Sequence, residues 1–272
     1  MLLSDFSYNE SDIITTDRYL NITRKHNSCL CYVKTDFFVL NRQLNWRGQI
    51  HPCFNDFRQT VVVGHSDYSI TDEIIGKYPT FKKWFVVNNF TTQSNVVSLP
   101  LGITNYCNES PIHLIYGDNS MFFDTLSTEK HETTLAFMNF NINTFPTERN
   151  YVWNLFKDKS WVKTGSIENT REGRLTYMKD IYNSKFCVCP RGNGLDTHRL
   201  WESLYLKTIP VVIYHNHFAN MSDLPILFIN NWSEVTEDFL NIKYEEMSKK
   251  QYNLDKLKIG YWENAIITST HA

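Results

Sequence analysis

The sequence predicts an α/β protein with two halves, each built on a parallel β-sheet. Short β-branched and apolar runs alternate along the chain with segments whose apolar residues recur at helical spacing. Because strands that alternate with helices pair in parallel through right-handed crossovers, each half is expected to form its own sheet. The chain has 272 residues, of which 42% are hydrophobic, enough for two domains of about 130 residues each. We expect an N-terminal domain over residues 1–125 and a C-terminal domain over residues 126–272.

The first half is expected to contain three buried strands and a short helix. The strands are β-branched or aromatic runs that end at polar or turn residues: 59–64, 83–87 and 95–99. A helix is expected over 71–77, because Thr71 can cap it and acidic residues occupy its first turn. The polar segment 104–132 is interpreted as the link between the two halves.

The second half repeats the alternation with more elements. Strands are expected at 134–139, 161–163, 186–189, 209–213 and 225–229, and helices at 146–156, 174–183, 197–207 and 236–243. In parallel sheets of this kind, ligands collect beyond the carboxyl ends of the strands. The polar clusters at 65–67, 88–89, 139–143, 164–166 and 190–199 all follow strands and are therefore expected to lie together.

The stretch 185–213, KFCVCPRGNGLDTHRLWESLYLKTIPVVI, is the most informative in the chain. It reads as a strand, a glycine-bearing turn, an amphipathic helix and a second strand. Gly192 and Gly194 allow the backbone to approach a ligand closely, and the N–H groups of a helix N-terminus favour anions. Asp196 and Thr197 are expected to cap the helix. With the fixed charges of Arg191 and Arg199, the turn predicts a site for a phosphorylated ligand, most simply a nucleoside diphosphate.

Composition excludes several other classes of protein. A net charge of −2 argues against a nucleic-acid partner, and no apolar run approaches the ~20 residues of a membrane span. The N-terminus lacks the basic and apolar regions of a signal peptide. The cysteines at 29, 31, 53, 107, 187 and 189 contain no C-x-x-C pair, so reduced thiols in the cytoplasm are expected, without a zinc site.

The C-terminal motifs resemble those of exostosin-like glycosyltransferases, the family-47 type. That family carries a similar P-x-G turn, R-x-x-E helix and strand with a P-V pair, matched here by Pro190, Gly192, Arg199, Glu202 and Pro210-Val211. Over residues 60 to 235 the pattern is most similar to a short, single-chain group found in large algal viruses and bacteria. The shared segments are 65–67 (HSD), 100–103 (PLGI), 139–149 and 192–202 (GNGLDTHRLWE).

This resemblance implies a GT-B fold, in which two Rossmann-like domains face each other across a cleft. It further implies an inverting hexosyl- or pentosyltransferase that needs no metal or other cofactor, with a UDP-linked sugar as donor and a glycan as acceptor. The absence of a D-x-D carboxylate pair agrees with metal independence. Small size and the viral-type pattern favour UDP-xylose, and a viral origin would place the protein in the host cytoplasm. The last helix, about 254–267, is expected to cross back to the first domain.

The resemblance also assigns donor-binding residues, each with a structural alternative. Glu202 would accept hydrogen bonds from the ribose hydroxyls, or else pair with Arg199. Arg199 would neutralise the pyrophosphate, or else form an interior ion pair with Glu202 or Asp180. Arg149 would make a second phosphate contact, or else lie in solvent.

The remaining donor residues are assigned by position along the chain. Lys163 and Thr164 end a strand and would touch the base. His198 would meet phosphate or acceptor, or else be a packed polar side chain. The turn itself would supply backbone donors through Asn193 and Gly194.

The catalytic base is expected from the other domain. Inverting transfer needs a group that removes the proton of the acceptor hydroxyl as its oxygen attacks C1. His65 and Asp67 both follow the strand 59–64. Asp67 fits the usual carboxylate role, whereas His65 has the more suitable ordinary pKa; a turn-forming role for Asp67 is the alternative.

Two other functions remain open from the sequence. A G-N-G turn after a strand is also found in NAD(P)-dependent oxidoreductases, although Thr197 stands where the third glycine of that fingerprint belongs. A non-catalytic carbohydrate-binding protein on a transferase fold is the second alternative.

Overall fold

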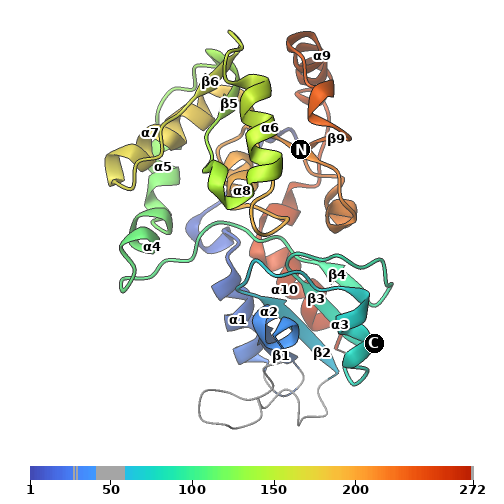
Figure 1. Cartoon of the computed structure of the whole chain (residues 1–272). Helices are drawn as coiled ribbons and strands as arrows, with labels where there is room; N and C mark the ends of the chain where they lie inside the picture. The colour runs from blue at the N-terminus through green and yellow to red at the C-terminus, as the bar shows by residue number, and fades with distance from the viewer. Residues whose placement is uncertain (27, 29, 41–58, 271–272) are drawn as a thin grey trace.

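The structure, a computed structural model, describes residues 1–26, 28, 30–40 and 59–270. Two lobes are visible in Figure 1, each with a parallel sheet at its centre. The predicted α/β class is confirmed, and the arrangement is that of the GT-B fold.

The sheet of the N-terminal lobe runs in the order β1-β2-β3-β4, and every neighbouring pair is parallel. Side chains alternate across it, as the two-residue period of a strand requires. Val61 and Val63 face a small apolar core with α2 and α3, whereas Val62 faces the larger core that includes α1. The elements are α1 (Thr16–Lys25), β1 (Leu30–Lys34), α2 (Thr35–Val39), β2 (Thr60–Gly64), α3 (Asp72–Lys77), β3 (Lys83–Val86) and β4 (Val96–Ser98).

The sheet of the C-terminal lobe has the order β6-β5-β7-β8-β9, again all parallel. The chain places β6 on one side of β5 and then β7 on the other side, so the order in which strands are added reverses between β5 and β7. In such folds, ligands bind outside the carboxyl ends of the strands at that point. The strands are β5 (Thr134–Met138), β6 (Val162–Thr164), β7 (Ser184–Val188), β8 (Ile209–Ile213) and β9 (Leu227–Ile229). The helices are α6 (Pro146–Phe156), α7 (Arg171–Tyr182), α8 (His198–Tyr205) and α9 (Glu237–Met247).

The segment 104–132 is more than the link that the sequence suggested. It contains α4 (Pro111–Tyr116) and α5 (Ser120–Leu126), and both helices contact α7 of the C-terminal lobe. Met121 and Phe122 of α5 are buried in the large core, which explains why this polar-looking stretch is ordered. Helices α4 and α5, which the predicted boundary at 125/126 places in the first domain, therefore pack with the second lobe.

Contacts between helices and buried hydrogen bonds join the two lobes. The last helix, α10 (Ile259–Thr268), contacts α1 of the N-terminal lobe (Figure 1). The buried hydroxyl of Tyr205, at the end of α8, accepts from the N–H of Ile14 at 2.8 Å and donates to the Leu257 carbonyl at 2.8 Å. Short 3₁₀ helices lie at Leu3–Asp5, Glu10–Asp12, Ile142–Thr144, Asn216–Met221, Trp232–Glu234 and Leu254–Leu257.

The cysteines depart from the expectation of reduced thiols. Cys31, buried in β1, is disulfide-bonded, whereas Cys107, Cys187 and Cys189 are free. Cys29 and Cys53 lie outside the described residues. The argument from reduced thiols to a cytoplasmic location therefore fails at Cys31. Among the described helices, none has the length and apolar character needed to span a membrane.

Candidate active site

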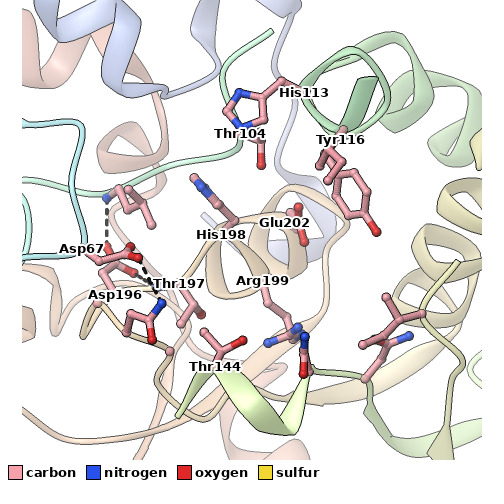
Figure 2. A pocket seen from close by; sticks show the side chains of 18 of the residues that line it. Asp67, Thr104, His113, Tyr116, Thr144, Asp196, Thr197, His198, Arg199 and Glu202 are labelled. Atoms are coloured by element: carbon pink, nitrogen blue, oxygen red, sulfur yellow. Dashed lines mark hydrogen bonds between the residues drawn. The ribbon is translucent and has the colours of Figure 1, made fainter. Parts of the chain in front are cut away.

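A cleft of about 630 Å³ lies between the lobes, and most of the predicted site residues line it. The C-terminal lobe contributes the glycine turn after β7 and the first turns of α8. The N-terminal lobe contributes the residues after β2, and α4 contributes from the segment that links the two sheets. In Figure 2, His198, Arg199 and Glu202 rise from one helix, with Asp67 to one side of them and Tyr116 to the other. Predicted residues that line the cleft are His65, Asp67, Arg149, Gly192, Asn193, Gly194, Asp196, Thr197, His198, Arg199 and Glu202.

The two glycines of the turn admit two different neighbours. A Cβ on Gly192 would lie 3.1 Å from the Arg149 guanidinium of the same lobe. A Cβ on Gly194 would lie 2.9 Å from the side-chain amide of Asn88, which comes from the N-terminal lobe. Asn88 is buried, and its Oδ1 accepts from the N–H of Asp196 at 2.9 Å. The second glycine thus allows the lobes to touch at the turn.

Asp196 joins the lobes instead of capping α8. Its carboxylate accepts from the Leu101 N–H at 2.9 Å, from the Trp201 indole at 2.9 Å and from the Thr197 N–H at 2.8 Å. The predicted capping role is therefore wrong for Asp196, because its oxygens accept from Leu101 of the other lobe and from Thr197 and Trp201, and from none of the backbone N–H groups of the first turn of α8. Thr197 is the N-cap residue, but its side chain makes no capping hydrogen bond; it lines the cleft.

His198 makes a second link between the lobes. Its Nδ1 lies 2.8 Å from the Gly102 carbonyl in the segment 100–103. Of the two predictions for His198, a packed polar side chain and a ligand contact, the first describes this nitrogen. His198 also lines the cleft, so a ligand contact by the rest of its side chain stays a prediction.

Two arginines meet at the C-terminal wall. The guanidinium carbons of Arg149 and Arg199 lie 5.5 and 5.8 Å from the ring centre of Phe140. Arg149 is buried and donates to the carbonyls of Arg191 and Asn141 at 2.8 and 2.7 Å. Burial, with repulsion from Arg199, lowers the pKa of Arg149 to about 10. The wall therefore brings two guanidinium groups close together, and neither forms an ion pair with a described residue.

Arg199 is free of the predicted ion pairs. Within the part of the chain that the structure describes, its guanidinium has no ion-pair partner, and its buried Nε has no hydrogen-bond acceptor. Glu202 pairs with Arg174, and Asp180 pairs with Lys163 at 2.6 Å, so both structural alternatives for Arg199 are wrong. An unpaired cation at a helix N-terminus is suited to bind an anion.

Glu202 lies at the middle of the cleft and is held by α7. Its Oε1 accepts from Arg174 Nη2 at 2.6 Å, and its Oε2 accepts from the Tyr177 hydroxyl at 2.7 Å. Burial alone would raise the pKa of Glu202, but the Arg174 charge and these hydrogen bonds bring it below its ordinary value. The carboxylate is therefore ionised, and each oxygen retains a lone pair for a ligand.

His65 is clamped on both ring nitrogens. Nε2 lies 2.8 Å from Asp17 Oδ1, and Nδ1 contacts the Tyr32 hydroxyl. Burial lowers the pKa of His65 despite the Asp17 carboxylate. Its backbone is left-handed, with φ of 56°, which turns the chain sharply after β2.

Asp67 is exposed two residues further along, and its carboxylate faces the glycine turn. Its Oδ2 lies 3.4 Å from the amide nitrogen of Asn193, the residue between the two glycines.

Three predicted donor residues lie outside the cleft lining. Lys163 and Thr164 are exposed at the end of β6, where Lys163 pairs with Asp180. Arg191 folds back over the ring of Phe145, 4.5 Å from its centre, and donates to the Asn193 carbonyl at 3.1 Å. A strand end and a turn present side chains on both sides. The sequence alone does not indicate which of these side chains face the ligand.

Comparison with known families agrees with this geometry. The family described as the Exostosin GT47 domain matches residues 13–236, a range that includes every described strand of both sheets. The chain belongs to the exostosin GT47 family. Within the described residues, no group of three or more His, Cys, Asp or Glu side chains is arranged to hold a metal ion.

Curated relatives match short segments only. A probable glycosyltransferase of Arabidopsis thaliana is 32% identical over 84 residues, 28% of this chain and 15% of that protein. Exostosin-1c of Danio rerio is 33% identical over 67 residues, 25% of this chain and 8% of that protein. This chain thus matches less than a sixth of either relative's length. A crystal structure of an α1,3-fucosyltransferase is similar with a TM-score of 0.40 and 13% identity, covering 99% of this chain and 94% of that chain.

Sequence reasoning missed several residues of this exostosin-family site. Arg174, Tyr177 and Tyr116 line the cleft beside Glu202, and none was assigned a role. Arg174 and Tyr177 lie three residues apart on α7, so they share a helix face, which is the one signal that could have grouped them. Tyr116 lies in the segment interpreted as a link.

Proposed function

We propose that this chain is an inverting glycosyltransferase that transfers a sugar from a UDP-sugar to a hydroxyl group of a glycan. The observation that carries the proposal is the cleft itself. One wall presents at a helix N-terminus an arginine, Arg199, that has no ion-pair partner among the described residues, and the facing lobe presents an exposed carboxylate at Asp67. Anion binding and proton removal are the two functions that such a transfer requires.

The donor would lie along the C-terminal wall. Its diphosphate would meet Arg199, Arg149 and the backbone N–H groups at the start of α8, which the Thr197 side chain does not cap and where the helix dipole adds positive charge. As the bond between C1 and the diphosphate oxygen breaks, the leaving UDP gains charge, and these groups stabilise it. Glu202, ionised and fixed by Arg174, is oriented to accept hydrogen bonds from ribose hydroxyls.

Asp67 is the better candidate for the base. Both ring nitrogens of His65 are engaged, so it would have to break a contact before taking a proton. Asp67 is exposed beside Asn193, where the C1 end of a donor held at the glycine turn would lie. The acceptor oxygen would form its bond to C1 as its proton passes to Asp67 and UDP departs from the opposite face. We therefore assign His65 a positioning role.

The finer identity of the reaction rests on the family resemblance. We propose UDP-xylose as donor, a metal-independent mechanism and a glycan acceptor. Calorimetry with UDP in the presence of EDTA tests the donor and the metal together, and a screen of UDP-sugars by UDP release tests the sugar. UDP binding that survives EDTA supports the proposal. NAD binding without UDP binding would instead identify an oxidoreductase, and UDP binding with no turnover for any sugar would favour a non-catalytic binding protein.

A further inference from the structure

The cleft extends past Glu202 to an apolar end that the proposed roles leave unused. Ile112 of α4 and Ile167 of the loop after β6 both line it, although each is 52% exposed. Tyr116 lies between these elements, and its hydroxyl donates to the Asn169 side chain at 3.1 Å. Apolar side chains exposed together inside a cleft indicate a ligand with an apolar face.

Arg174, which is almost fully buried, lies beside both this end of the cleft and Glu202, the proposed ribose contact. Arg174 contacts the rings of both Tyr116 and Tyr177, with its guanidinium carbon 4.8 and 5.0 Å from their centres. The same guanidinium pairs with Glu202, and its buried Nε has no acceptor in the described part of the chain. Tyr116, Arg174 and Glu202 therefore form a continuous floor contributed by α4, α7 and α8.

The loop that carries Ile167 is fixed at both ends. Asn139, at the end of β5, donates through Nδ2 to the Ser166 carbonyl at 2.7 Å, and Tyr116 holds Asn169. A Cβ on Gly165 would lie 2.9 Å from that same Asn139 nitrogen, so the loop approaches β5 closely. The subsite is therefore preformed against the sheet edge.

We propose that this end of the cleft is the nucleobase subsite of the donor, with Ile112, Tyr116 and Ile167 contacting the faces of the base. The inference rests on the proposed nucleotide-sugar donor. With the sugar directed at Asp67 and the diphosphate at Arg199, the ribose meets Glu202, and the base must continue away from Asp67. In Figure 2 Tyr116 stands on the far side of Glu202 from Asp67.

The assignment replaces Lys163 and Thr164 as base contacts. It also gives α4 a function: this helix contributes Ile112 and Tyr116 to the base subsite while it packs on α7. A flat base between aliphatic and aromatic side chains gains binding energy from its apolar faces whatever its edge pattern.

Calorimetry with two probes tests the subsite. UDP and ribose 5-diphosphate differ only in the base, so wild-type protein should bind UDP at least tenfold more tightly. The double variant Ile112→Ser/Ile167→Ser should lose at least fivefold in UDP affinity and bind ribose 5-diphosphate unchanged. Both positions are half exposed, so folding should be preserved. Leu114→Ser is the matched control, because Leu114 is 43% exposed on the same helix but does not line the cleft.

The outcomes separate this inference from the proposed function. If wild-type protein binds UDP tightly and the double variant does so equally well, the base lies elsewhere and only the subsite is wrong. If wild-type protein binds UDP no better than ribose 5-diphosphate, no base subsite exists. If neither probe binds, the nucleotide-sugar donor itself is wrong, and the subsite falls with it.

Discussion

Glu202 is paired with Arg174, not with its helix neighbour Arg199. The two charged groups are 2.6 Å apart and almost completely buried, although they belong to helices α8 and α7. Because of this pairing, Arg174 and Arg199 have different roles. Arg174 holds the carboxylate, whereas Arg199 is left facing the cleft without a counter-ion among the described residues.

Replacing each arginine by methionine should therefore give opposite results. Arg199→Met should change the free energy of unfolding little and lower UDP affinity roughly 10- to 100-fold, because a charged hydrogen-bond donor to phosphate is lost. Arg174→Met should cost about 3–5 kcal/mol of stability, because it leaves Glu202 buried without its partner. Denaturant unfolding and calorimetry measure the two effects. Equal destabilisation by both changes would contradict the division.

Asp67→Asn should abolish transfer and keep donor binding. The amide cannot take the acceptor proton, so kcat should fall at least about 100-fold while UDP affinity stays the same. Asp67 is exposed, and the hydrogen bond that its side chain makes to Asn193 is long, at 3.4 Å, so folding should be unaffected. Steady-state UDP release with a donor and acceptor found by screening provides the measurement. A variant that retains full rate would exclude Asp67 as the base.

Gly194→Ala should weaken the contact between the lobes. The new Cβ would lie 2.9 Å from the Asn88 amide nitrogen, and Asn88 is buried and hydrogen-bonded to Ser66 and Asp196. The movement needed to relieve this clash should lower the free energy of unfolding by about 1–3 kcal/mol. Gly76→Ala is the control, because Gly76 lies in α3 with nothing within 4 Å of a Cβ; it should stabilise by up to about 1 kcal/mol. Denaturation midpoints that change alike would argue against the close approach.

Stability should fall when the solution is acidified through pH ~6.5. Burial lowers the pKa of His65 and of His215 in the folded protein, so the unfolded chain binds protons first as the pH drops. The neutral forms dominate in both states above that range, and no penalty arises there. His65→Asn tolerates the left-handed backbone and should reduce the loss of melting temperature between pH 7.5 and 5.5. An unchanged slope would show that His65 does not titrate with unfolding.

Local patterns fixed much of the fold. The expected strand, turn, helix and strand over 185–213 appear as β7, α8 and β8, and the predicted helix 146–156 coincides with α6. These segments carry strong periodicity and sharp turn signals, so neighbouring residues alone define them. Helix α5 was missed because Met121 and Phe122 are buried by elements distant in the sequence, and α4, which buries no residue fully, was missed because it is held by packing on α7.

What the sequence determined by itself was the alternation of strands and helices over 59–99 and 134–243, the parallel sheets, and most of the polar residues at strand ends that line one cleft. Only the tertiary structure decided how those polar groups are used. Asp196 and His198 bind the segment 100–103, Glu202 pairs with Arg174, and Arg199 has no ion-pair partner in the part of the chain that the structure describes. The reason is physical: a helix or strand fixes where a side chain starts, but its hydrogen-bond partner is whichever group packing brings within about 3 Å, from any part of the chain.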